Sequence, residues 1–103
     1  MSYKLFDICV NLTDDVFVGK EKNIIDAANK NNVAKMVLVG NDLDSSLKVS
    51  SFAEQFSFVA TAGYHPHNAK DWNEKSYDSL LSILKKNHVK AVGECGLDFN
   101  RNF

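Results

Sequence analysis

Glu94 is the residue of this sequence that points most directly to chemistry. It follows the apolar pair Ala91 and Val92, and Gly93 and Gly96 beside it leave room for a ligand or another backbone. A lone ionised carboxylate late in a buried strand is costly to desolvate, and a metal ion or a cationic partner removes that cost. The adjacent glycines therefore favour a role for Glu94 in chemistry, with its charge balanced by a metal ion or by an Arg or Lys partner. The alternative is a solvated carboxylate just beyond the strand end.

Two polar residues that follow Glu94 extend this stretch. Asp98 is expected to act with Glu94 in catalysis by orienting it or a metal-bound water. Arg101 has forked, planar donors that match a phosphate, and we expect it to bind substrate. The alternative for both residues is a solvated chain end.

Two histidines and an asparagine complete the set of candidate residues. His65 and His67 have the H-x-H spacing of many metal ligands, but Pro66 between them marks a turn, so the two rings are expected to point apart. We expect His65 to bind a substrate phosphate or water, the alternative being two loop histidines without a ligand. Asn11, after the first apolar run, is expected to hydrogen-bond a ligand.

Four short apolar runs must position these residues. Each is rich in β-branched or aromatic residues and ends in glycine or a polar turn, which predicts strands. The runs are nearly continuous, as in parallel strands covered on both faces. They span residues 4–10, 34–40, 56–63 and 89–96. Helical patterns between them span residues 20–32, 41–56 and 73–87.

Each helical pattern predicts its own buried face. For residues 20–32 the apolar stripe is Ile24, Ile25 and Ala28. For residues 41–56 it is Leu43, Leu47 and Phe52, with Asp42 or Asp44 at the N-terminus. For residues 73–87 it is Tyr77, Leu80, Leu81 and Leu84, with Asn73 or Ser76 as the cap.

The order β-α-β-α-β-α-β predicts an α/β fold with parallel strands and right-handed crossovers. Two architectures fit: an open doubly wound sheet, or the first part of a (β/α)₈ TIM-type barrel. Both place functional residues at the carboxyl ends of the strands. Asn11, Asn41, His65 and Glu94 each follow one strand, so a single site is expected at that edge.

Composition and charge indicate which kinds of partner and which cellular compartment to expect for this protein. The 103 residues are 45% hydrophobic and carry a net charge of −1, which gives no electrostatic reason for tight non-specific nucleic-acid binding. A nuclease is still allowed, because a bound metal supplies positive charge locally. Cys9 and Cys95 form no C-x-x-C pair or disulfide framework, which predicts a reducing compartment and a cytoplasmic protein. No run reaches membrane-spanning length, so no membrane association is expected.

Three motifs, "FDICVNLT", "TAGYHPH" and "AVGECGLDFNRNF", together resemble the TatD-family deoxyribonucleases, which are metal-dependent hydrolases of the amidohydrolase type. The resemblance implies a (β/α)₈ barrel of which residues 1–103 form a single N-terminal half-barrel segment. It implies hydrolysis of DNA phosphodiester bonds, typically from a 3′ end, with a divalent metal such as Mg, Mn or Zn. Glu94 matches the family's metal-bridging glutamate, and His65 matches a histidine on the substrate side of the site.

The sequence also departs from the family pattern. Many members carry D-x-H-x-H on the first strand, where this chain has Asp7, Cys9 and Asn11. The family's other ligands lie on later strands, so the 103-residue chain is expected to be inactive or a poor nuclease. Two alternatives stay open: a non-catalytic half-barrel that acts by partner binding or by self-association through exposed strand edges, and a metal-dependent hydrolase of small substrates.

Overall fold

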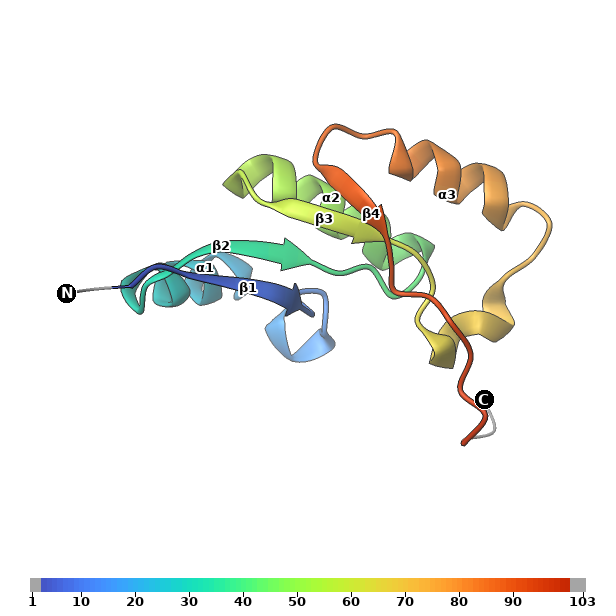
Figure 1. The fold of residues 1–103 in the computed structure, drawn as a ribbon, viewed down its shortest axis with the longest axis horizontal. Coiled ribbons are helices and arrows are strands. Elements are labelled where there is room, and N and C mark those ends of the chain that lie inside the picture. The colour runs from blue at the N-terminus through green and yellow to red at the C-terminus, as the bar shows by residue number, and fades with distance from the viewer. Residues whose placement is uncertain (1–2, 101–103) are drawn as a thin grey trace.

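A computed structural model describes residues 3–100 and shows a parallel sheet whose strands alternate with helices (Figure 1). The strands are β1 (Leu5–Val10), β2 (Val33–Leu38), β3 (Val59–Ala62) and β4 (Val89–Val92). The α-helices are α1 (Glu21–Lys30), α2 (Leu43–Phe56) and α3 (Ser76–Leu84), and the short 3₁₀ helices are η1 (Asp15–Phe17) and η2 (Pro66–Asp71). The strand order is β1-β2-β3-β4 with every neighbouring pair parallel, which confirms the predicted α/β order.

The hydrophobic core lies between the sheet and the helices. Successive right-handed crossovers between adjacent parallel strands place the connecting helices on the same face of a sheet. Buried residues of the helices, of β2, β3 and β4, and of the loops beside them accordingly form one cluster. Its members are Leu12, Ile25, Met36, Leu38, Val49, Ala53, Phe58, Ala60, Ala62, Leu80, Ile83 and Val89. No helix within residues 3–100 is long and apolar enough to cross a membrane.

The two edge strands are much more exposed than the inner ones. On β1, Leu5 and Phe6 are each 56% exposed and Ile8 is 75% exposed. On β4, Val92 is 61% exposed, although Val89 is buried. The expectation of strands covered on both faces is therefore wrong for β1 and β4. The reason is that the described helices cover one face of the sheet and no described strand pairs with the outer edges.

The predicted buried faces of α2 and α3 are partly wrong. Leu47 of α2 is 47% exposed and Tyr77 of α3 is 62% exposed, and in α2 small residues take most of the buried positions. In α2 the buried residues are Ser45, Ser46, Val49, Ser50 and Ala53, and in α3 they are Ser76, Leu80 and Ile83. A helix that packs closely on a sheet favours small side chains there, which an apolar count overlooks. For α1, the predicted face with Ile25 buried is confirmed.

Candidate active site

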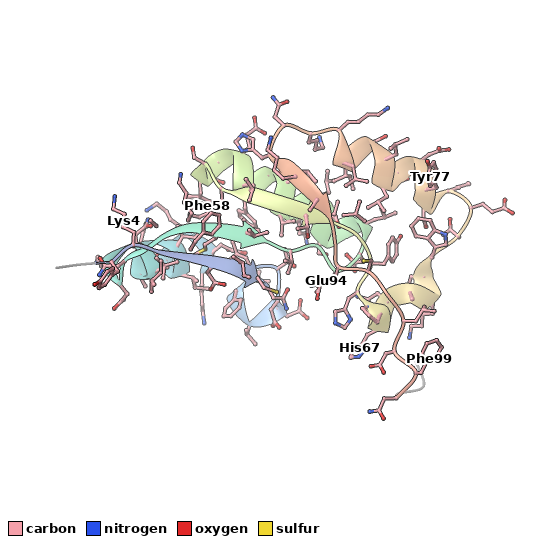
Figure 2. All side chains as sticks on the ribbon, viewed as in Figure 1. Lys4, Phe58, His67, Tyr77, Glu94 and Phe99 are labelled. Carbon is pink, nitrogen blue, oxygen red and sulfur yellow. The ribbon has the colours of Figure 1, made fainter. Side chains whose placement is uncertain are left out.

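The carboxyl ends of the four strands carry the polar residues selected from the sequence. Asn11 follows β1 and His65 lies beyond β3. Glu94, labelled in Figure 2, lies two residues past the end of β4. The side-chain amide of Asn41, after β2, donates to Oδ1 of Asn11 at 2.9 Å. The carbonyl oxygen of Asn41 accepts from the backbone N–H of His65 at 2.8 Å. These bonds join the ends of β1, β2 and β3, so the predicted convergence at this edge is present in the structure.

The backbone at Glu94 is held by its neighbours on two strands. Its N–H donates to the carbonyl of Gly40 at 2.8 Å, and the N–H of Gly93 donates to the carbonyl of Ala62 at 2.9 Å. The Thr61 hydroxyl donates to the carbonyl of Gly93 at 2.7 Å and accepts from the N–H of Gly40 at 3.2 Å. Thr61 therefore connects three strand ends. Thr61 was not among the residues predicted from the sequence; its signal there is a hydroxyl within an apolar run, which must find hydrogen-bond partners when buried.

Close approach of backbones explains two glycines of the site. The hydroxyl of Ser46, a fully buried residue of α2, accepts from the N–H of Gly63 at 3.1 Å. A Cβ on Gly63 would overlap the carbonyl oxygen of Glu94 and lie 2.8 Å from the carbonyl carbon of Gly93. A Cβ on Gly40 would overlap the Ser46 hydroxyl. Gly63 thus lets the end of β4 approach the end of β3, and Gly40 lets the start of α2 approach the end of β2.

The two histidines lie against each other. Their ring centroids are 4.5 Å apart in an edge-to-face arrangement, so the expectation that the rings point apart is wrong. His65 caps η2, and its Nδ1 accepts from the backbone N–H of His67 at 3.0 Å. Because Nδ1 accepts, a neutral His65 carries its proton on Nε2, which makes that atom a donor. The Pro66 turn folds the chain back and brings the rings together.

His67 also contacts Asp98, a contact that sequence analysis did not identify. Its Nε2 lies 3.0 Å from Oδ2 of Asp98, and both side chains are partly buried. The backbone N–H of Asn100 donates to the other oxygen of Asp98 at 2.9 Å. The expected role of Asp98 in orienting Glu94 or a metal-bound water stays a prediction, and the structure shows Asp98 beside His67. The segment after β4 is thereby attached to η2.

The carboxylate of Glu94 is half-buried and makes no hydrogen bond or ion pair with residues 3–100. It lies beyond β4 rather than within it, as the alternative reading of the sequence allowed. An apolar cavity of about 400 Å³ adjoins it, with the rings of Tyr64 and Trp72 meeting edge to face at 5.3 Å. Its lining is Gly63, Tyr64, Ala69, Trp72, Leu80, Val92, Glu94, Cys95, Gly96 and Leu97. This arrangement places one carboxylate beside an apolar surface on which an apolar group of a ligand could pack.

A metal site is not completed by the described residues. Within residues 3–100, no three His, Cys, Asp or Glu side chains are grouped so as to hold a metal ion. Protein sites for zinc normally use three or four such ligands. The metal that the family resemblance implies therefore does not fit this donor set alone, and Glu94 stays a predicted ligand. Arg101, the predicted phosphate contact, lies outside the described residues.

An acidic hollow of about 320 Å³ lies beside the site, near η1 and the start of α2. Asp42 caps α2: its carboxylate accepts from the N–H of Ser45 at 2.8 Å, and the Ser45 hydroxyl accepts from the N–H of Asp42. Lys48 lies 3.1 Å from Asp44. The hydrogen bond and charge of Asp44 raise the pKa of Lys48, with smaller contributions from Asp42 and Asp15. The cap at Asp42 and the ion pair of Asp44 with Lys48 thus stabilise the N-terminal part of α2.

Comparison with known proteins places this geometry in a family. The model of the family described as TatD related DNase matches residues 6–103. A protein of Citrobacter koseri named 3′-5′ ssDNA/RNA exonuclease TatD is 38% identical over 100 residues, which cover 96% of this chain and 38% of that protein. The protein of the same name from Edwardsiella piscicida is 41% identical over 101 residues, covering 96% and 39%. The chain thus spans about two-fifths of the length of these relatives.

A solved structure supports the same relationship. The crystal structure of a hydrolase TatD family protein from Entamoeba histolytica matches with a TM-score of 0.83 at 28% sequence identity. The match covers 98% of this chain and 40% of that one. The predicted fold, the first part of a (β/α)₈ barrel, is confirmed by this likeness.

Proposed function

The chain belongs to the TatD related DNase family, and from this premise we propose that it contributes part of the active site of a metal-dependent nuclease. The observation that carries the proposal is the position of Asn11, His65 and Glu94 at one carboxyl edge, within a segment that the family model covers. In (β/α)₈ enzymes this edge holds the chemistry. The substrate proposed is single-stranded DNA or RNA, degraded from its 3′ end, as the names of the relatives state for those proteins.

The proposed roles follow from what each side chain offers. Glu94 serves as a metal ligand, since its carboxylate is half-buried and unpaired within residues 3–100. His65 donates from Nε2, and Asn11 hydrogen-bonds through its side chain, toward the substrate backbone. Arg101 adds a phosphate contact. Asp98, which contacts His67, acts with Glu94 in this proposal by orienting it or a metal-bound water.

The donor set also supports a proposal about the 103-residue chain itself, that it does not degrade nucleic acid. Glu94 is the one predicted metal ligand, and a single carboxylate does not hold zinc tightly. Because no three His, Cys, Asp or Glu side chains among residues 3–100 are grouped so as to hold a metal ion, no hydrolytic step is assigned to these residues alone.

A chimera tests both statements. Residues 1–103 would replace the matching part of the Citrobacter koseri relative and be incubated with 3′-labelled single-stranded DNA and Mg²⁺ or Mn²⁺. We expect metal-dependent 3′-5′ degradation by the chimera, none by the isolated chain, and loss of activity in the Glu94→Gln chimera. A folded chimera without nuclease activity, or a Glu94→Gln chimera as active as its parent, would contradict the proposal.

The alternatives from sequence analysis give different results in the same assay. A hydrolase of small substrates would turn over small phosphoesters or cyclic amides while leaving the labelled DNA intact. A non-catalytic half-barrel would leave all of these substrates unchanged. The cytoplasmic location expected from the cysteines stays a prediction.

A further inference from the structure

We propose that His67 is a positioning residue, which holds the imidazole ring of His65 in the orientation from which His65 donates to substrate. The donor role of His65 rests on the proposed function, and the part of His67 is added to it here. Three contacts carry the proposal. They run from the backbone of His67 to His65, between the two rings, and from the ring of His67 to Asp98.

The first contact fixes one nitrogen of His65. The backbone N–H of His67 donates to Nδ1 of His65 at 3.0 Å, which leaves Nε2 as the proton-bearing atom of the neutral ring. Within residues 3–100, that Nε2 makes no hydrogen bond. The backbone is held as well, because the N–H of His65 donates to the carbonyl of Asn41 and its carbonyl accepts from the N–H of Asn68, both at 2.8 Å. His65 thus presents one available donor from an anchored stretch of backbone.

The second contact limits rotation of the His65 side chain. The ring centroids of His65 and His67 are 4.5 Å apart, and the ring planes meet at 75°. Aromatic pairs in this arrangement have centroids about 4.5–7 Å apart, so these two rings lie at the close end of that range. A change of the His65 side chain to another rotamer would break this packing. The ring of His67 is therefore the support against which the ring of His65 is held.

The third contact fixes His67 itself. Its Nε2 lies 3.0 Å from Oδ2 of Asp98, and an ionised carboxylate only accepts hydrogen bonds, so Nε2 carries a proton. The side chains of His67 and Asp98 are 34% and 25% exposed, so water competes less with this bond than it would at an open surface. The carboxylate is held in turn, since its Oδ1 accepts from the N–H of Asn100 at 2.9 Å. A hydrogen bond of this kind sets the tautomer and the orientation of an imidazole ring.

The contacts form a series from Asp98 through His67 to His65. Asp98 lies four residues after Glu94, so the series joins the segment with the proposed metal ligand to the segment with the proposed substrate donor. A carboxylate has about four acceptor positions, so these bonds are compatible with the role proposed for Asp98 toward Glu94 or a metal-bound water. If His67 only fastened η2 to the segment after β4, the bond to Asp98 would matter and the ring packing would not.

Two variants of the 103-residue chain separate these roles. His67→Gln has an amide that can donate to Asp98 but no ring, whereas His67→Phe has a ring but no donor. Three-bond couplings between the α and β protons of His65 report its χ1 rotamer populations without metal or substrate. We expect one rotamer in the parent and in the control His88→Gln, whose ring contacts the carbonyl of Phe58 at the other end of the sheet. His67→Gln should show mixed rotamers, and His67→Phe should lie closer to the parent.

The opposite pattern would overturn the proposal. Rotamer populations of His65 that are the same in His67→Gln as in the parent would show that the ring of His67 does not hold His65. More averaging in His67→Phe than in His67→Gln would show that His67 acts only by fastening the two segments.

A double-mutant cycle in the chimera with the Citrobacter koseri relative tests the effect on activity. His67→Gln should lower kcat/KM for 3′-labelled single-stranded DNA about tenfold, through a weakened hydrogen bond to a charged phosphate. In a chimera that also carries His65→Ala, His67→Gln should have little further effect, because His67 acts through His65. Equal losses with and without His65 would overturn the inference. An inactive chimera would refute the proposed function instead, and the rotamer populations would still decide whether His67 positions His65.

Discussion

The hydroxyl of Thr61 lies between two strand ends, donating to the carbonyl of Gly93 at 2.7 Å and accepting from the N–H of Gly40 at 3.2 Å. It is the side chain that links the end of β3 to the backbone carrying Glu94. The position of the proposed metal ligand therefore depends on a residue with no role in chemistry. Four predictions test the contacts of Thr61 and three other features that hold the strand ends, η2 and α2 in place.

Thr61→Val keeps the side-chain shape but removes both hydrogen bonds. Leaving the buried groups of Gly40 and Gly93 without this partner should lower the free energy of unfolding by about 1–3 kcal/mol. Urea denaturation measures this loss. Hydrogen exchange should show reduced protection of the Gly40 amide in Thr61→Val and retained protection in Thr61→Ser, which keeps the hydroxyl. Equal protection in both variants would contradict the assigned role.

Gly63→Ala should disturb the site, because its Cβ would overlap the backbone of Gly93 and Glu94. Overpacking of this kind costs about 1–3 kcal/mol of stability. Gly93→Ala is the matched control: its Cβ would meet Thr61 at 3.7 Å, an ordinary contact. Thermal unfolding of the two variants should separate them clearly, and a Gly63→Ala protein as stable as Gly93→Ala would refute the close approach.

Asp98→Ala should release the segment after β4 from η2, because it removes the carboxylate beside His67. Asp98→Asn keeps an oxygen that accepts from a ring N–H and should preserve the contact. Ring ¹⁵N–¹H correlation spectra would show changed His67 signals in the alanine variant and near-parental signals in the asparagine variant. The effect on stability should stay below about 1 kcal/mol, since both groups are partly exposed. Unchanged ring signals in Asp98→Ala would rule out this attachment.

Asp42→Ala should destabilise α2 more than Asp44→Ala does. Asp42 caps the helix through the N–H of Ser45, and loss of an N-cap costs about 0.5–2 kcal/mol. Asp44 is exposed and pairs with Lys48 on the helix surface, where solvent screens the two charges and loss of the pair costs less than loss of the cap. Chemical denaturation of both variants measures the difference. The reverse order of stabilities would show that the cap is not formed.

The local features of the fold could be predicted from the sequence alone. Apolar runs that alternate along the chain with helical patterns predicted parallel strands. Parallel strands are covered on both faces, so their runs are continuously apolar, and they are joined by crossover helices. Asp42, one of two caps considered, was identified by its position before an apolar pattern, and Ile25 by helical periodicity. The polar residues after the strands predicted the edge at which Asn11, His65 and Glu94 lie. Each of these inferences depends only on neighbours in the chain.

Only the tertiary structure decided which groups meet across strands. The contacts of Thr61 with Gly93 and of Ser46 with Gly63 join residues 32 and 17 positions apart, and spacing in the sequence carries no signal for such pairs. The pairing of Asp98 with His67 and the contact between the histidine rings depend on how η2 turns back. The exposure of β1 depends on which strands surround it, because the sequence of an apolar strand does not indicate whether another strand pairs with its edge. Contacts between residues far apart in the sequence therefore determine the geometry of this site, whereas the local sequence pattern indicates only which residues belong to it.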